Sequence, residues 1–154
     1  MRIPAWLRAI SFFLIAPTPI VVLGPLLVEG GVEPRIGLPG RIIAILLFVT
    51  GLSVLLWCFR DFVVRGQGTP APYDPPRKLV VQGLYRFTRN PMYVGIFLAL
   101  LGETLWRWSP ALLLYAAIVA VAFHIRVLVY EEPKLAELFG AEFAEYRARV
   151  RRWL

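Results

Sequence analysis

The sequence has 154 residues, so a single domain covering 1–154 is expected. Hydrophobic residues make up 58% of the chain, and they lie in long blocks, which is typical of a membrane protein. The formal net charge is +7, but few cations lie inside those blocks. The charge therefore indicates topology and headgroup contacts, and it argues against nucleic acid as a partner. One cysteine excludes an internal disulfide, and one histidine argues against a metal centre.

Four apolar blocks predict about four transmembrane helices, over residues 10–28, 42–59, 91–106 and 111–130. A spanning helix needs about 20 apolar residues, so the third block is somewhat short. Prolines and glycines in the first block predict a kinked or broken helix. Ser109-Pro110 suits a tight turn, so the third and fourth blocks are expected to form a helical hairpin.

After Tyr130, apolar residues recur at helical spacing as far as Trp153 while the opposite face is charged. This pattern predicts a C-terminal amphipathic helix on the membrane interface or packed on the spans. The predicted fold class is therefore all-α, an integral membrane helix bundle that ends in this helix. Cys58 lies in an apolar run, where a small buried side chain is expected.

Orientation is predicted from the basic residues of the loops. The 60–91 loop and the C-terminal tail carry most of the Lys and Arg outside the apolar blocks, so this loop and both termini are expected in the cytoplasm. The predicted location is accordingly the cytoplasmic membrane. The proline-rich stretch 65–78 cannot form a continuous helix, and we interpret it as a functional loop rather than a linker.

Arg89-Asn90-Pro91 has the chemistry of a helix start. Asn90 can cap the helix, and Pro91 suits the first helical position because its missing N–H needs no partner there. The free N–H groups of such a helix end, together with Arg89, would attract an anion. Local physics favours this function and a purely structural helix start equally.

Glu131 and Glu132 follow the fourth block, where acids at a helix C-terminus would oppose the macrodipole. A solvated helix end and a cationic partner are both compatible with that position. Arg126 lies about one turn deeper, where it either pairs with one of these acids or extends to the membrane surface. His124 is expected to be a hydrogen-bonded core residue, with catalysis as a minor alternative.

Two runs of residues carry a resemblance to a known superfamily. They read Leu79-Val-x-x-Gly83-x-Tyr85-Arg-x-x-Arg89-Asn-Pro91-Met-Tyr93-x-Gly95 and Arg126-x-x-x-Tyr130-Glu-Glu132-Pro-x-Leu135-x-x-x-Phe139-Gly140-x-x-Phe143-x-x-Tyr146. Separated by the predicted hairpin, they resemble the isoprenylcysteine carboxyl methyltransferase and phospholipid N-methyltransferase superfamily. The likeness covers about residues 79–154, the half of the chain in which this superfamily builds its cofactor site.

The resemblance implies an enzyme that transfers a methyl group from S-adenosylmethionine to a lipid or lipid-like acceptor at the cytoplasmic face. It implies that Arg126 and Glu131 face the substrate. The implied cofactor-binding residues are Gln82, Gly83, Tyr85, Arg89, Asn90, Pro91, Tyr93 and Glu132. Acids suit the cationic groups of the cofactor, Arg89 suits its carboxylate, and the tyrosine rings suit its sulfonium.

Asn90 and Gln82 stand where the carboxyl methyltransferases usually carry histidine, so the acceptor stays open between an amine headgroup, a carboxylate and a small apolar molecule. An amine must lose a proton before attack, for which Glu131 and His124 are candidate bases. A carboxylate needs only a cation such as Arg126 to place it. Two other classes are a nicotinamide-dependent membrane reductase of related architecture and a non-catalytic membrane scaffold.

Overall fold

The computed structural model describes residues 5–28, 36–66 and 77–154, and within them every regular element is helical. The predicted all-α class is therefore confirmed for this part of the chain. Three helices are long and apolar enough to cross a membrane, namely Ile10–Val28, Leu38–Gly66 and Pro110–Arg149. A fourth span is not established, because helix α4, Pro91–Arg107, has only 17 residues. Most of the proline-rich stretch, residues 67–76, lies outside the described residues.

The first helical stretch is interrupted, as its prolines predict. It consists of α1 (Ala5–Ile15), the π-helical turn η1 (Pro19–Leu23) and α2 (Gly24–Val28). The Gly24 N–H bonds to the Pro19 carbonyl, five residues back, immediately before Pro25. This wider turn suits a position where the next residue has no N–H. The Tyr115 hydroxyl donates to the Ile20 carbonyl at 2.9 Å, so a neighbouring helix supplies a partner within the interrupted segment.

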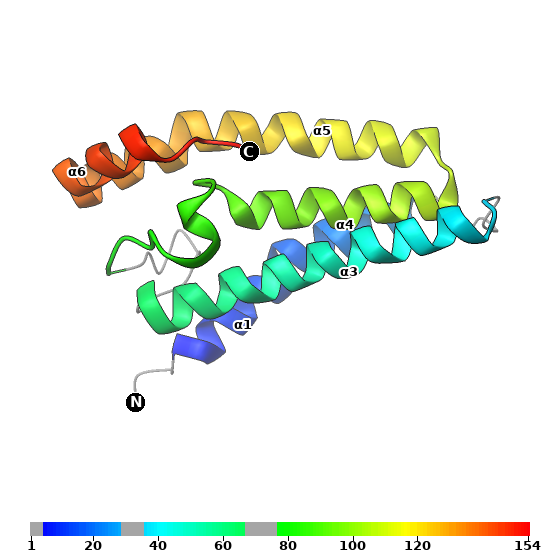
Figure 1. Ribbon diagram of the computed structural model, residues 1–154, viewed down its shortest axis with the longest axis horizontal. Coiled ribbons are helices and arrows are strands. Elements are labelled where there is room, and N and C mark those ends of the chain that lie inside the picture. The colour runs from blue at the N-terminus through cyan, green and yellow to red at the C-terminus, as the bar shows by residue number, and fades with distance from the viewer. Residues whose placement is uncertain (1–4, 29–35, 67–76) are drawn as a thin grey trace.

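Helix α3 (Leu38–Asp61) continues into the π-helical turn η2 (Phe62–Gly66) and packs along α4. Glycines bring the two backbones into contact. A Cβ atom on Gly51 would lie 2.5 Å from both the Gly95 carbonyl oxygen and the Ala99 nitrogen. Leu55 and Ile96 are buried in the core beside this contact, and Figure 1 shows the two helices lying side by side.

Helices α4 and α5 (Pro110–Arg126) form the predicted hairpin. Trp108 adopts the left-handed conformation with φ 51°, and the Ser109 side chain caps α5 by accepting a bond from the Leu112 N–H at 3.1 Å. At the other end of the hairpin, the short 3-10 turn η3 (Gly83–Arg86) precedes α4. Figure 1 shows this turn, the end of α3 and helix α6 gathered at one end of the molecule.

The sequence pattern predicted that the fourth helix would end at Tyr130, but in the structure it does not end there. It continues through the π-helical turn η4 (Val127–Glu131) into α6 (Glu132–Arg149). The Glu132 N–H bonds to the Val127 carbonyl, again five residues back and immediately before a proline. Glu131 and Glu132 are therefore not at a helix C-terminus, so the predicted conflict with the macrodipole does not arise.

The predicted C-terminal helix is present but is divided at Gly140, whose φ of 47° interrupts the helical backbone. Phe143 and Tyr146 turn inward and are buried. The helix ends at Arg149, and Trp153 belongs to a non-helical segment that runs back beside α5 (Figure 1). The predicted helix is therefore present but shorter than its apolar spacing indicated, and the turn at Gly140 uses a backbone conformation that glycine adopts more readily than other residues.

We expect Gly51→Ala to lower the free energy of unfolding by about 1–3 kcal/mol, because the added methyl group would push α3 away from the backbone of α4. Thermal or denaturant unfolding in detergent measures this. Gly40→Ala is the matched control in the same helix, since its Cβ would meet only the Ile36 side chain, at 3.3 Å. Equal stability of the two variants would contradict the close contact.

Candidate active site

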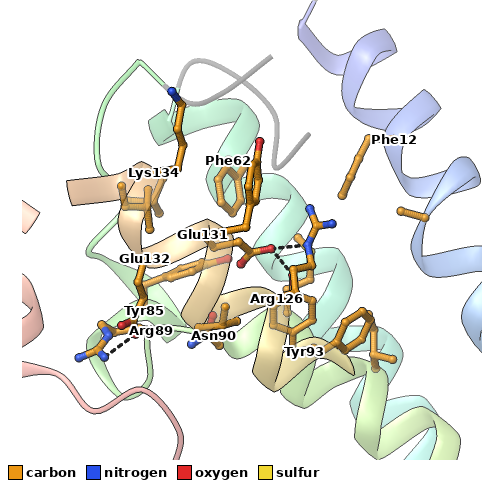
Figure 2. A pocket seen from close by; sticks show the side chains of 18 of the residues that line it. Phe12, Phe62, Tyr85, Arg89, Asn90, Tyr93, Arg126, Glu131, Glu132 and Lys134 are labelled. Carbon is orange, nitrogen blue, oxygen red and sulfur yellow. Dashed lines mark hydrogen bonds and ion pairs between the residues drawn. The ribbon is translucent and has the colours of Figure 1, made fainter. Parts of the chain in front are cut away.

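A cavity of about 430 Å³ opens at the end of the molecule where η3, η4 and α6 meet. Its volume is in the range of about 300–1,000 Å³ usual for small-molecule sites. Figure 2 shows charged side chains from the two halves of the hairpin meeting in it, with Phe12 of α1 on the opposite side. The lining residues without charge include Phe12, Ile15, Pro17, Ile20, Phe62, Met92, Ile96, Phe123, Val127 and Leu135.

The first polar group of the cavity, here called the open cluster, consists of Arg126, Glu131 and Tyr93. The Arg126 Nε donates to Glu131 Oε1 at 2.8 Å, and the Tyr93 hydroxyl donates to the same oxygen. The predicted partner of Arg126 is thereby identified as Glu131. The side chains of Arg126 and Glu131 are 42% and 26% exposed, so a ligand in the cavity can reach them (Figure 2).

The second polar group, here called the closed cluster, consists of Arg89, Glu132 and Arg152. Arg89 Nη2 and Arg152 Nε donate to Glu132 Oε1 at 2.7 and 2.8 Å, and Arg152 Nη2 donates to Oε2 at 2.9 Å. The Arg89 and Glu132 side chains are only 9% and 10% exposed. Glu132 is therefore not a solvated acid at a helix end, because two guanidinium groups hold it in place.

Asn90 does not cap α4, which corrects the prediction from the sequence. Its Nδ2 instead donates to the Arg152 carbonyl at 3.0 Å, and its backbone N–H donates to Thr88 Oγ1 at 3.2 Å. Pro91 occupies the first helical position as predicted, but it is buried and does not line the cavity. Asn90 thus joins the start of α4 to the end of the chain.

Tyr85 reaches the cavity from η3 and is buried. Its ring meets the Phe62 ring edge to face at a centroid distance of 5.7 Å, and its carbonyl accepts a bond from the Tyr146 hydroxyl at 2.7 Å. Burial, and next the neighbouring Cys58 thiol, raise the pKa of the Tyr85 phenol well above its ordinary value. Tyr85 therefore presents a neutral ring to the cavity.

The structure brings most of the predicted site residues to one cavity. Those that line it are Tyr85, Arg89, Asn90, Tyr93, Arg126, Glu131 and Glu132. Gln82, Gly83 and Pro91 do not line it, and Gln82 is exposed. His124 also lies outside the lining, where its Nδ1 accepts a bond from Trp153 Nε1 at 3.1 Å.

Gly83 shapes the turn that carries Tyr85. Its φ is +63°, and a Cβ there would lie 2.3 Å from Asp61 Oδ2. Asp61 is fully buried and pairs with Arg65 at 3.4 Å between Oδ1 and Nη1. Gly83 therefore satisfies both a backbone requirement and a space requirement at the end of α3.

Sequence reasoning missed the residues of the first helix and the role of Arg152. Phe12, Pro17 and Ile20 lie in a block that carries no motif, so nothing in the sequence marked them as cavity residues. Arg152 belongs to the basic C-terminal tail, whose charges were interpreted as a signal for membrane orientation. The Arg-Arg-Trp ending offers no spacing signal for a contact with Glu132, twenty residues earlier.

The fold and the cavity define a helical protein with helices long and apolar enough to cross a membrane, and with a cavity where two segments, distant in sequence, meet at one end of a hairpin. Comparison with known families assigns this class more closely. The phospholipid methyltransferase family model matches residues 40–142, which is more than half of the chain. The chain therefore belongs to the phospholipid methyltransferase family.

Similar proteins include protein-S-isoprenylcysteine O-methyltransferase B of Arabidopsis thaliana, 33% identical over 73 residues, which are 47% of this chain and 37% of that protein. A probable protein-S-isoprenylcysteine O-methyltransferase of Oryza sativa subsp. indica is 31% identical over 78 residues, 51% of this chain and 41% of the other. Methanethiol S-methyltransferase 1 of Bradyrhizobium diazoefficiens is 30% identical over 90 residues, covering 58% and 28%.

The matched region thus spans about two fifths or less of these relatives, and no solved structure matches the chain.

We expect Gly83→Ala to destabilise the protein by more than about 1 kcal/mol, because it adds a methyl group against Asp61 at a left-handed backbone position. In the background of Asp61→Ala, the same change should cost less, since the overlapping carboxylate is gone. Unfolding of the two single variants and the double variant measures this coupling. Strictly additive costs would show that Asp61 does not restrict Gly83.

Proposed function

We propose that this protein is a membrane methyltransferase that takes its methyl group from S-adenosylmethionine and transfers it to a lipid or lipid-like acceptor at the cytoplasmic face. The observation that carries the proposal is the cavity in which the open cluster, the closed cluster and the apolar wall of α1 meet. Membership of the phospholipid methyltransferase family supports it, and so do relatives that are named as methyltransferases.

The donor fits the chemistry of the cavity. Tyr85 and Tyr93 offer ring faces for a sulfonium, and Arg89 and Glu132 offer opposite charges for an amino-acid group. The volume suits a nucleoside with such a group attached. When bound, S-adenosylmethionine supplies an electrophilic methyl group on a positive sulfur, so the protein has to supply alignment and a site shielded from water.

The acceptor is proposed to occupy the side of the open cluster. Figure 2 shows Arg126 paired with Glu131 through one nitrogen, while the other end of its guanidinium lies on the side of the cavity that faces Phe12. Phe12 and Ile20 from the first helix and Phe123 from α5 provide an apolar surface there. A molecule with a charged head and an apolar tail matches this arrangement, since the head meets Arg126 while the tail stays in hydrocarbon.

Among acceptors, the geometry favours a carboxylate over an amine. Glu131 Oε1 already accepts bonds from the Tyr93 hydroxyl and the Arg126 Nε, so this oxygen is engaged and poorly placed to take a proton from an ammonium group. Arg126 is suited to orient a carboxylate, because its planar guanidinium matches the carboxylate oxygens. A carboxylate oxygen then forms the bond to the methyl carbon, the electrons of the broken sulfur–methyl bond remain on sulfur, and no proton has to move.

His124 is a poorer candidate for a base, because it lies outside the cavity lining and its Nδ1 already accepts a bond from Trp153. The reductase alternative gains no support from the relatives described above, which are named as methyltransferases. The proposed arrangement places the closed and open clusters near the cytoplasmic headgroups, in agreement with the basic residues of the 60–91 loop.

The test is transfer of labelled methyl from S-adenosylmethionine by the purified protein in lipid vesicles. Two acceptors are compared, a prenylated cysteine with a free carboxylate and an ethanolamine phospholipid. We expect label in the first, released by mild base as an ester would be. Label in neither acceptor, and none in a total lipid extract, would overturn the proposed function. Label in the phospholipid alone would overturn the preference for a carboxylate.

We expect Arg126→Ala to lower kcat/KM for the acceptor about 100-fold, because it removes the cation that orients the head of the acceptor. The affinity for S-adenosylhomocysteine should change little. Arg126→Lys should restore only part of the rate, since lysine lacks the planar fork. Arg86→Ala is the control, because Arg86 is exposed and lies outside the cavity lining. An equal loss in Arg86→Ala would contradict a specific role for Arg126.

A further inference from the structure

The last residues of the sequence form part of the site. After α6 the backbone becomes extended at Val150, and the following residues run back across the start of α4. Figure 1 shows this segment at the red end of the chain, running from α6 back beside α5. The Arg89 N–H donates to the Arg151 carbonyl at 2.9 Å, and the Arg89 Nη1 donates to the Val150 carbonyl at 2.7 Å. The C-terminal segment is therefore held against the residues that immediately precede α4.

Arg152 is the residue of this segment that enters the closed cluster. Its Nε and Nη2 engage Glu132 Oε1 and Oε2 at 2.8 and 2.9 Å, a two-point contact that sets the plane of the carboxylate. The Arg152 carbonyl accepts bonds from Thr88 Oγ1 and Asn90 Nδ2, both at 3.0 Å. The backbone and the side chain of one residue thus hold two cavity residues, Asn90 and Glu132.

Arg152 also changes the charge of this end of the cavity. Arg89 and Glu132 alone would be neutral, but two guanidinium groups against one carboxylate leave one positive charge. In addition, Arg89 Nε is buried without a hydrogen-bond partner in the part of the chain that the structure describes, so one donor of this cluster is unused. A net positive charge and an unused donor suit an anion.

We propose that Arg152 is a positioning residue that turns the closed cluster into the binding place for the carboxylate of the methyl donor. The inference rests on the proposed function, because it assigns one end of the donor to one end of the same cavity. Arg152 acts through Glu132 and Arg89: it holds the Glu132 carboxylate in one plane and supplies the positive charge that Glu132 would otherwise cancel.

The experiment compares the binding of two ligands to the full chain in detergent. One is S-adenosylhomocysteine, and the other is S-adenosyl-3-thiopropylamine, which keeps the ammonium and lacks only the carboxylate. The wild type should bind the first about 10–100-fold more tightly. Arg152→Gln should weaken the binding of S-adenosylhomocysteine about tenfold and leave the affinity for the second ligand unchanged. Arg152→Lys should retain part of the preference for S-adenosylhomocysteine. Arg149→Gln, which removes an exposed arginine paired with Glu145, should leave both affinities unchanged.

A merely structural role for Arg152 predicts a different result. Arg152→Gln would then weaken the binding of both ligands by the same factor, or it would only lower the unfolding temperature of the protein. Either outcome would overturn the inference while leaving the proposed function intact. Wild-type protein that binds neither ligand would overturn the proposed function itself. If Arg152→Gln does not fold, Arg152→Lys decides, because an unchanged preference between the ligands in that variant would equally overturn the inference.

Discussion

The ion pairs of Glu132 are the interaction on which the rest of the site depends. Glu132 follows the turn after α5, Arg89 precedes α4, and Arg152 comes from the end of the chain, so one carboxylate joins three segments. Most of this cluster is removed from water. A buried ion pair adds little net stability, but loss of Glu132 would cost about 3–5 kcal/mol because it would leave Arg89 and Arg152 without their shared carboxylate. Its value is therefore that it fixes one arrangement of the cavity.

The closed and open clusters give the two ends of the cavity different degrees of exposure. In the closed cluster two guanidinium groups hold the Glu132 carboxylate, and the Arg89 and Glu132 side chains are largely buried, whereas the side chains of Arg126 and Glu131 remain partly exposed beside the apolar wall of the first helix. Methyl transfer between two bound molecules requires mainly that they be held in line. Under the proposed function, the closed cluster would hold the methyl donor and the accessible end would receive a tailed acceptor.

The sequence predicted the helices because a long apolar block has few other structures available in a membrane. It failed where a helix continued past charged residues. Glu131, Glu132 and Pro133 look like a helix end, but the π-helical turn places a wide hydrogen bond just before the proline, so the helix passes through.

The candidate site was predictable as far as motifs reached. Tyr85 and Tyr93 were implied by the resemblance of their sequence run to a known superfamily, and both line the cavity. Asn90 lines the cavity, but the predicted capping role was wrong, because its side chain donates to a distant carbonyl that no local pattern reveals. The contact between Arg152 and Glu132 depends on the turn at Gly140 and the extended backbone that follows α6, which are set by tertiary packing rather than by periodicity.

Hydrogen–deuterium exchange of the detergent-solubilised protein, with and without S-adenosylhomocysteine, tests the central claim most directly, namely that two distant segments enclose one ligand. The account predicts that the ligand slows amide exchange in both 83–95 and 126–135 at the same ligand concentration. Amide exchange in the turns of α3 that lie away from the cavity should remain unchanged. Slower exchange in only one of the two segments, or in neither, would contradict it.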